Sequence, residues 1–330
     1  MNIPSKKFYA DSLAFLGLQG QPPVNRSQLS LAHITSVPPY VKDFDIVLRM
    51  HLVFQVRALS NAWVHGVYEK SDISKPDMGI LFGLQHAPED LTLARVRELA
   101  SAGIRSMAIA YDGSTEYGDG FKGDGGLTPQ GEKLIDWMCA TGIILDLSHA
   151  GHATAREAIE YILRHRLPMM PMMSHSGCYE LFPHPRNIPN DIIDSIGGPM
   201  NGYIGIPAIT FLTMPQSKVQ FWKTYFLQHV GVMSTVCHSA FNVGIGSDCN
   251  HIDMTMQEAR LHFDNMSKML ATDGSFGEYF PDRPPEVIEQ GSTMFEIFES
   301  ALLHSFPSKM VEGFCGKNFK NFLLRSLPQT

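Results

Sequence analysis

Three residues that could do metal chemistry lie at the ends of three separate apolar runs. These residues are His149, His175 and Asp248. Neutral imidazoles bind zinc well, and a catalytic zinc ion commonly has three protein ligands and one water, whose pKa it lowers toward about 7. A lone histidine in such a place is more often a hydrogen-bonded core residue. Two histidines, each with a serine neighbour that can fix its tautomer, favour a pair of ligands for one zinc ion. Asp248 would then be the general base or the third ligand.

Two segments near these residues allow two interpretations each. Arg186 lies in the proline-containing stretch 182–187, where it could clamp a substrate carboxylate or cap the next helix at the surface. Asp112–Gly126 is rich in glycine and acidic residues, which is typical of a mobile lid or of a solvated acidic loop. His251 and Asp253 either line the pocket or begin the following helix. The methionines of Met169–Met173 are more typical of core filling than of metal binding.

The elements that must position these residues alternate along the chain. Short apolar runs alternate with amphipathic helices, which predicts βα units around a parallel sheet. Eight such runs predict a closed (β/α)8 TIM-type barrel of the α/β class, whose site lies where the strands end. The expected strands are Lys7–Phe15, Leu29–Ser36, Gly79–Gln85, Ile104–Tyr111, Ile143–Ser148, Met169–Ser174, Gly202–Pro207 and Val243–Ser247.

Helix boundary signals support this organisation. Thr128 followed by Pro129 begins a helix that runs to about Ala140, and Gly142 ends it. Further helices are expected over Ala153–Arg166 and Asp43–Val64, the latter with a single apolar stripe of Ile46, Met50, Val53 and Val56. The first two strands are the least regular, and a helix is an alternative for Tyr9–Leu16. A doubly wound open sheet is the competing fold, but the first strand is not followed by GxGxxG.

Composition excludes several classes of protein. The chain has 330 residues, of which 44% are hydrophobic and 18% charged, so one domain spanning 1–330 can bury a large core. The net charge of −7 and the absence of a basic run argue against nucleic-acid binding. Five widely spaced cysteines without a CxxC pair are typical of reduced thiols. Since residues 1–20 read as neither signal peptide nor membrane anchor, we expect a cytoplasmic protein.

Several motifs in order resemble the renal (membrane) dipeptidase family, peptidase family M19, whose members are amidohydrolase-type barrels. No single motif is specific, but together they cover most of the chain. They are Gly126-Leu127-Thr128-Pro129-Gln130-Gly131, Asp146-Leu147-Ser148-His149, Ser174-His175-Ser176, His184-Pro185-Arg186-Asn187, Gly244-Ile245-Gly246-Ser247-Asp248 and the closing Gly316-Lys317-Asn318-Phe319.

The resemblance implies roles for individual residues. Active members hold two zinc ions, and His149 and His175 match the two histidines of one of them. Arg186, with Asn187 beside it, matches the substrate-binding arginine that grips a carboxylate. Asp248 matches the aspartate that shuttles the proton.

Other positions depart from the family pattern. Leu13 and Phe15 stand where active members place the His-x-Asp ligands of the other zinc, and neither side chain can bind a metal. Gln85 matches the bridging glutamate and would be a weak third ligand. Tyr111 matches a histidine that stabilises the tetrahedral intermediate, and its hydroxyl can donate to an oxyanion. The resemblance therefore implies one zinc ion, with the second site lost.

Three hypotheses follow. The first is a dipeptidase-like metallohydrolase with one zinc, which cleaves an amide bond in a small carboxylate-bearing substrate. The second is an altered homologue that has lost hydrolysis and acts as a metal-free tailoring enzyme or as a small-molecule binding protein. The third is a scaffold whose function is homodimerisation, which rests only on the tendency of the family to pair.

Overall fold

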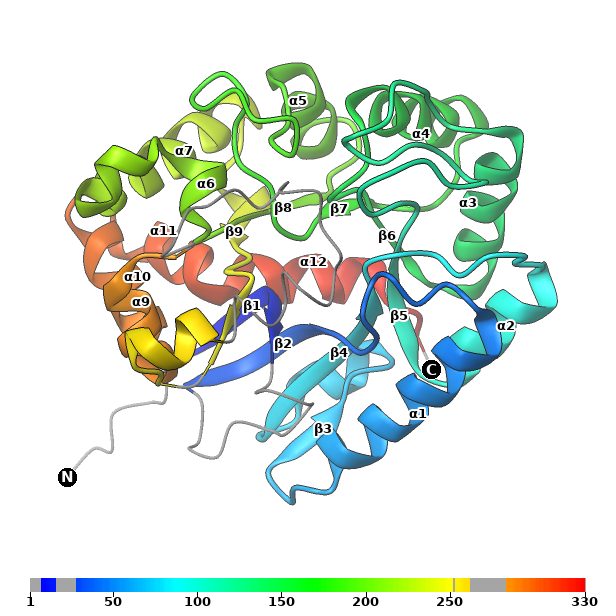
Figure 1. Cartoon of the computed structure of the whole chain (residues 1–330), viewed down its shortest axis with the longest axis horizontal. Helices are drawn as coiled ribbons and strands as arrows, with labels where there is room; N and C mark the ends of the chain where they lie inside the picture. Colours follow the sequence, from blue (N-terminus) through cyan, green and yellow to red (C-terminus); the bar gives the residue numbers. More distant parts are fainter. Residues whose placement is uncertain (1–6, 16–27, 252, 262–282, 330) are drawn as a thin grey trace.

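The computed structural model describes residues 7–15, 28–251, 253–261 and 283–329, and the strands in this part of the chain form one parallel sheet (Figure 1). Its order is β10-β1-β2-β4-β5-β6-β7-β8-β9, with β3 paired to β4 outside this path. The strands are β1 Tyr9–Phe15, β2 Leu29–Thr35, β3 Val64–Gly66, β4 Met78–Leu84, β5 Ile104–Ala108, β6 Ile144–Asp146, β7 Met172–Met173, β8 Tyr203–Ile206, β9 Val243–Ile245 and β10 Cys249–Asn250.

The sheet closes through one continuous segment of chain. On one side β9 pairs with β8, and on the other β10 pairs with β1, while only three residues separate β9 from β10. Counting β9 and β10 as one interrupted strand, eight parallel strands form the ring. The predicted (β/α)8 barrel is therefore confirmed, and so are all eight expected strands. The observed strands are mostly shorter because the polar residues at their ends leave the ladder for the loops of the site.

Helices follow the strands and surround the sheet (Figure 1). They are α1 Phe44–Leu59, α2 Leu93–Ser101, α3 Pro129–Thr141, α4 His152–His165, α5 Asn190–Gly197, α6 Thr210–Thr213, α7 Trp222–Val236, α9 Pro285–Glu289, α10 Met294–Leu303, α11 Ser308–Glu312 and α12 Asn318–Ser326. The signals that predicted α3 are confirmed, since the Thr128 hydroxyl accepts from the Gly131 amide and Gly142 ends the helix with φ +70°.

The prediction for α1 was wrong at the end of the helix. The helix ends at Leu59 instead of Val64, because Val64 begins β3, a strand that was not expected. The apolar stripe Ile46, Met50, Val53 and Val56 lies on the exposed side of the helix. Phe44, Val47, His51 and Ala58 form the buried face instead. A polar residue on the core side is possible because both ring nitrogens of His51 are hydrogen-bonded, to Ser36 Oγ and to the Ala102 carbonyl.

The final helix closes the end of the barrel opposite the site. Phe319, Phe322 and Leu323 of α12 pack in one apolar cluster with residues near the beginnings of the barrel strands, and α12 (red) lies against the strands in Figure 1. The strand residues in this cluster are Ala10, Leu31, Leu81, Ile144, Met172 and Tyr203. The carboxyl ends of the strands therefore form the end at which polar residues gather. Met169, Met172 and Met173 are buried, which confirms core filling for the methionine-rich stretch.

Glycine allows close packing inside the barrel above this cluster. A Cβ atom at Gly246 would lie 1.8 Å from the Ser174 carbonyl oxygen, and one at Gly205 would lie 2.1 Å from it. The same carbonyl accepts a hydrogen bond from Ser12 Oγ at 2.7 Å. At the opposite wall the His33 ring occupies the space that a Cβ at Gly83 would need. Glycines thus leave room for the Ser174 carbonyl at one wall of the barrel and for the His33 ring at the other.

Two buried histidines on the helices make stability depend on pH. Burial lowers the pKa of His51 on α1 and of His229 on α7. Below pH 6.5 the unfolded chain therefore binds protons that the folded chain does not. The stabilising effect of the two neutral histidines is fully present above pH 6.5 and is lost as the pH falls below that value. We expect the free energy of unfolding to decrease from pH 7 to pH 5, by at most about 1.4 kcal/mol per pH unit for each histidine.

Urea unfolding at the two pH values measures this effect. The double variant His51→Gln/His229→Gln should show a smaller decrease than the natural chain, because glutamine does not titrate. An equal decrease in both proteins would contradict the assignment to these histidines.

Candidate active site

The two histidines predicted to bind metal lie side by side at the ends of β6 and β7. Their Nε2 atoms are 3.0 Å apart, and both side chains are buried. Burial lowers the pKa of each well below the ordinary value, and the Arg186 charge lowers both further, so both rings are neutral. His149 has a positive φ of 72°.

A buried aspartate, Asp146, positions this pair. Its Oδ1 atom accepts from the backbone amides of Ser148 at 3.0 Å and Ser174 at 3.1 Å, so one carboxylate holds both strand ends. The Ser148 hydroxyl in turn accepts from the His175 amide. Ser174 Oγ lies 2.8 Å from Nδ1 of the His175 ring. Sequence reasoning missed this role, although a charged residue inside an apolar strand was a signal for it.

The histidine pair fits one metal ion. When the His175 Nδ1–H donates to Ser174 Oγ, the Nε2 lone pair of His175 faces His149. Two nitrogens that bind one tetrahedral zinc ion are roughly 3.3 Å apart, given Zn–N bonds of about 2.0–2.1 Å. The observed 3.0 Å is within a few tenths of an ångström of that spacing.

The same region does not fit a second metal ion. Leu13 is fully buried at the end of β1 and Phe15 is partly buried, and neither side chain has a donor atom. In the described ranges of the chain, no group of three or more His, Cys, Asp or Glu side chains could hold a metal. Gln85, just after β4, is buried, and its Nε2 has no hydrogen-bond partner among the described residues. A third protein ligand would have to be a neutral amide of this kind.

Arg186 is a buried cation beside the histidines. Its Nη2 atom donates to the His175 carbonyl at 3.3 Å, and its guanidinium lies 6.0 Å from the centre of the Phe121 ring. Burial lowers its pKa, while the charges of Asp248, Asp146 and Asp112 oppose that change. No carboxylate within the described part of the chain forms an ion pair with it at 4.0 Å or less. A buried arginine in this state fits an anionic ligand.

Asn187, the neighbour of Arg186, is occupied by contacts within the protein. Its Oδ1 accepts from the Gly177 amide, and its Nδ2 donates to the carbonyls of Phe182 and Leu212. These bonds hold the loop that carries Arg186. Substrate binding by Asn187 itself stays a prediction.

Tyr111 stacks on the ring of His149. The two rings stack with their centres 3.9 Å apart. Burial raises the pKa of the Tyr111 phenol, and the negative charges of Asp248 and Asp112 raise it further, so the hydroxyl keeps its proton at neutral pH. Tyr111 is therefore a hydrogen-bond donor in the same electrostatic neighbourhood as Asp248 and Arg186.

The loop Asp112–Gly126 folds back over the histidines. The Phe121 amide donates to the His149 carbonyl, and Tyr117 is fully buried, with its hydroxyl donating to the Pro88 carbonyl. The Phe121 ring lies 6.3 Å from both His149 and His184. The loop is thus anchored to the barrel at several points, and its movement as a lid stays a prediction.

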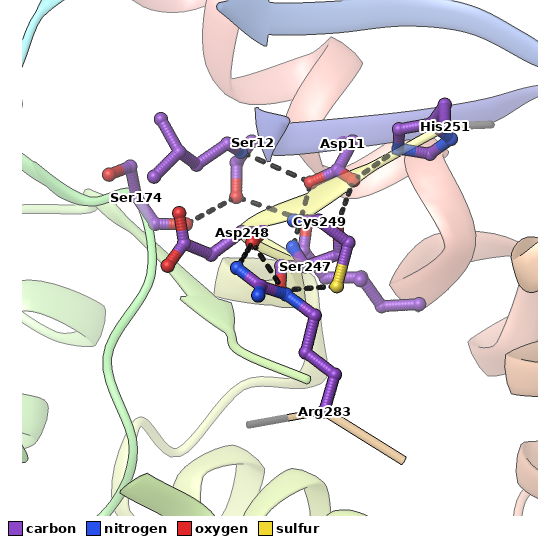
Figure 2. A network of polar contacts seen from close by, with 10 residues as sticks. Asp11, Ser12, Ser174, Ser247, Asp248, Cys249, His251 and Arg283 are labelled. Carbon is purple, nitrogen blue, oxygen red and sulfur yellow. Dashed lines mark hydrogen bonds and ion pairs between the residues drawn. The ribbon is translucent and has the colours of Figure 1, made fainter. Parts of the chain in front are cut away.

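Asp248 lies between β9 and β10, and its negative charge acts on both Tyr111 and Arg186. It is partly buried and has a φ of +56°. Its amide donates to the Leu13 carbonyl, and Arg283 donates to its carbonyl (Figure 2). His251, in contrast, is buried against Asp11, and Asp253 accepts from the Ser292 amide. Neither of these two residues is placed with the histidine pair.

Comparisons with known proteins agree with one another. A family model described as membrane dipeptidase (peptidase family M19) matches residues 46–278. The dipeptidase verJ of Clonostachys rogersoniana is 30% identical over 167 residues, which are 48% of this chain and 40% of that protein. An uncharacterized dipeptidase of Schizosaccharomyces pombe is 23% identical over 226 residues, covering 66% and 53%. The matched region thus spans about half or less of these relatives.

Solved structures share the fold. An amidohydrolase from Pseudomonas aeruginosa superposes with a TM-score of 0.76 at 20% identity, covering 97% of this chain and 96% of the other. A metallo peptidase from Rhodobacter sphaeroides, liganded with a phosphinate mimic of the dipeptide L-Ala-D-Ala, gives 0.73 at 14% identity, covering 97% and 99%. Among the helices of the described part of the chain, none has the length and apolar character that a membrane crossing needs.

Proposed function

The chain belongs to the membrane dipeptidase family, peptidase family M19, and from that premise we propose that it is a dipeptidase-like hydrolase with one metal ion. Its substrate would be a small molecule with an amide bond and a free carboxylate. The proposal rests on the two neutral Nε2 atoms, which lie 3.0 Å apart beside the buried Arg186. Among the described residues, no carboxylate forms an ion pair with this arginine. A cation site and an anion site thus lie next to each other, since Arg186 donates to the His175 carbonyl.

Each residue of the site has a role in this mechanism. His149 and His175 would hold the ion, which we expect to be zinc, with Gln85 as a weak third ligand. A bound zinc ion supplies Lewis acidity to the scissile carbonyl and to the attacking water. Arg186 binds and orients the substrate carboxylate, and Asp248 takes the proton from the water. Tyr111, which keeps its proton, donates to the developing oxyanion.

Hydrolysis of a matched pair of substrates tests the proposal. We expect cleavage of L-Ala-L-Ala or L-Ala-D-Ala that is lost after treatment with a chelator and restored by zinc. L-Ala-L-Ala amide, which lacks the carboxylate, should be cleaved at least about tenfold more slowly, because a charge-assisted hydrogen bond contributes about 1.5–3 kcal/mol. Cleavage that persists without metal, or equal cleavage of acid and amide, would contradict the proposal.

One set of residues favours a second candidate function. Leu13, Phe15 and Gln85 replace every ligand of the second ion that the resemblance implies, which suits a metal-free tailoring enzyme or a carboxylate-binding protein. Such a protein would bind L-Ala-L-Ala through Arg186 without cleaving it. Calorimetric binding of the dipeptide in the presence of chelator, with no product formed, would favour this candidate.

The setting of the enzyme is also a proposal. We expect one domain over residues 1–330 and a cytoplasmic location. The five cysteines, none of which forms a disulfide, support this location. Of the N-terminal stretch on which that location also rests, residues 1–6 and 16–20 lie outside the described part of the chain. We expect no nucleic-acid partner, and pairing into a homodimer stays a prediction.

A further inference from the structure

A buried carboxylate, Asp11 within β1, forms a compact polar network (Figure 2). Its Oδ1 atom accepts from the amides of Leu13 at 3.1 Å and Ser247 at 2.8 Å. Its Oδ2 atom accepts from the Ser247 hydroxyl at 2.5 Å and from His251 Nε2 at 2.8 Å. One fully buried group therefore ties the first barrel strand to the segment that closes the barrel.

The network surrounds Asp248 on both sides along the chain. Ser247 precedes it, and the Ser247 hydroxyl also accepts from the Cys249 amide, which follows it. The Asp248 amide donates to the Leu13 carbonyl at 2.8 Å. Asp248 itself has a φ of +56°, a conformation that residues other than glycine rarely adopt without support from their surroundings. Asp11 is the group on which these contacts converge.

His251 completes the network from the far side of β10. It is 2% exposed, and its ring stacks on Phe295 of α10 with the centres 5.9 Å apart. It is the only partner of the Asp11 carboxylate from beyond Cys249 in the described part of the chain. Without its N–H, the buried Oδ2 atom would keep only the Ser247 hydroxyl. A buried carboxylate that loses a donor is strongly destabilised. The loss would therefore destabilise the local backbone structure at Ser247 and Asp248.

We propose that Asp11 and His251 are positioning residues for the proposed hydrolase reaction, which hold Asp248 in its strained backbone conformation so that its carboxylate faces the site. The inference rests on the proposed function of Asp248 as the base. It is analogous to what Asp146 does for His149 and His175, since one buried carboxylate at each place fixes the backbone of the residues that act. Asp11 and Asp146 thus serve opposite walls of the same barrel end.

Hydrogen exchange measured by mass spectrometry tests the positioning without any need for activity. In His251→Ala, the amides of Ser247, Asp248 and Cys249 should exchange at least about tenfold faster than in the natural chain, because their local structure opens more easily. His251→Gln retains an N–H donor toward Asp11 and should stay within about threefold. The matched control is His51→Ala, which removes another buried, doubly hydrogen-bonded histidine far from this segment and should leave its exchange unchanged.

Steady-state kinetics on L-Ala-L-Ala separates positioning from general stability. We expect kcat to fall at least tenfold in His251→Ala with KM within about twofold, and His251→Gln to restore kcat to within about threefold. His51→Ala should lower the melting temperature without lowering kcat. If His251→Ala does not fold, Asp11→Asn gives the same test, because an amide nitrogen cannot accept from Ser247 or His251.

Two results would overturn the inference. One is that the Ser247–Cys249 amides of His251→Ala exchange at the same rate as in the natural chain. The other is that these amides exchange faster while kcat is unchanged. If the natural chain cleaves no dipeptide, the proposed function fails separately, and the exchange rates alone decide whether Asp11 and His251 hold Asp248 in place.

Discussion

Replacing His149 or His175 with alanine is expected to remove metal binding and to lower dipeptide hydrolysis by at least about 1000-fold, since the Lewis acid supplies several kcal/mol of transition-state stabilisation. Each histidine provides one of the two neutral Nε2 atoms that face each other 3.0 Å apart at this barrel end. Because the site has only two strong ligands, the loss of either one should abolish metal binding. Zinc titration by calorimetry and the rate of L-Ala-L-Ala cleavage measure the two effects.

A matched control distinguishes loss of the site from loss of the fold. His65 lies on β3, outside the ring of barrel strands, and its Nε2 is bonded to the Asp72 carbonyl. His65→Ala should keep both the metal and the activity. Activity that survives in His149→Ala/His175→Ala would show that the histidine pair is not the metal site, whatever the comparisons imply about the family.

The second large effect is expected at Arg186. In Arg186→Met, kcat/KM for L-Ala-L-Ala should fall about 100-fold, mainly through KM, because a charge-assisted hydrogen bond in a buried site is worth about 1.5–3 kcal/mol. Arg186→Lys keeps the charge but not the two-pronged geometry, so its loss should be smaller. The methionine side chain fills a similar volume beside Phe121 without the charge.

The substrate without a carboxylate provides the control for this prediction. Cleavage of L-Ala-L-Ala amide should change little between the natural chain and Arg186→Met. An equal loss with acid and amide would mean that Arg186 supports the structure of the loop 182–187 instead of binding the carboxylate.

The barrel was predictable from the sequence because its signals are local. Eight apolar runs separated by helices specify βα units, and the Thr128-Pro129 beginning and Gly142 end of α3 depend only on residues close in the chain. The orientation of α1 was not predictable in this way. Apolar residues occupy both sides of that helix, and the side that faces the core contains His51, which is buried only because Ser36 and Ala102 lie opposite its ring.

The candidate site was predictable to the extent that its residues end strands. His149, His175 and Asp248 follow from that rule, and the role of Arg186 follows from the resemblance. The residues that position them did not follow, because their contacts join distant parts of the chain. Asp11 contacts Ser247 and His251, more than 230 residues away. Hydrogen bonds over such separations are set by the closure of the barrel and leave no spacing pattern in the sequence.

Metal content decides whether this barrel holds one metal ion between His149 and His175, as we propose. Elemental analysis of freshly purified protein for zinc, iron and manganese, beside His149→Ala/His175→Ala, should give about one ion per natural chain and none in the variant. Two ions per chain, or none even after zinc is added back, would show that the histidine pair is not a site for a single metal ion.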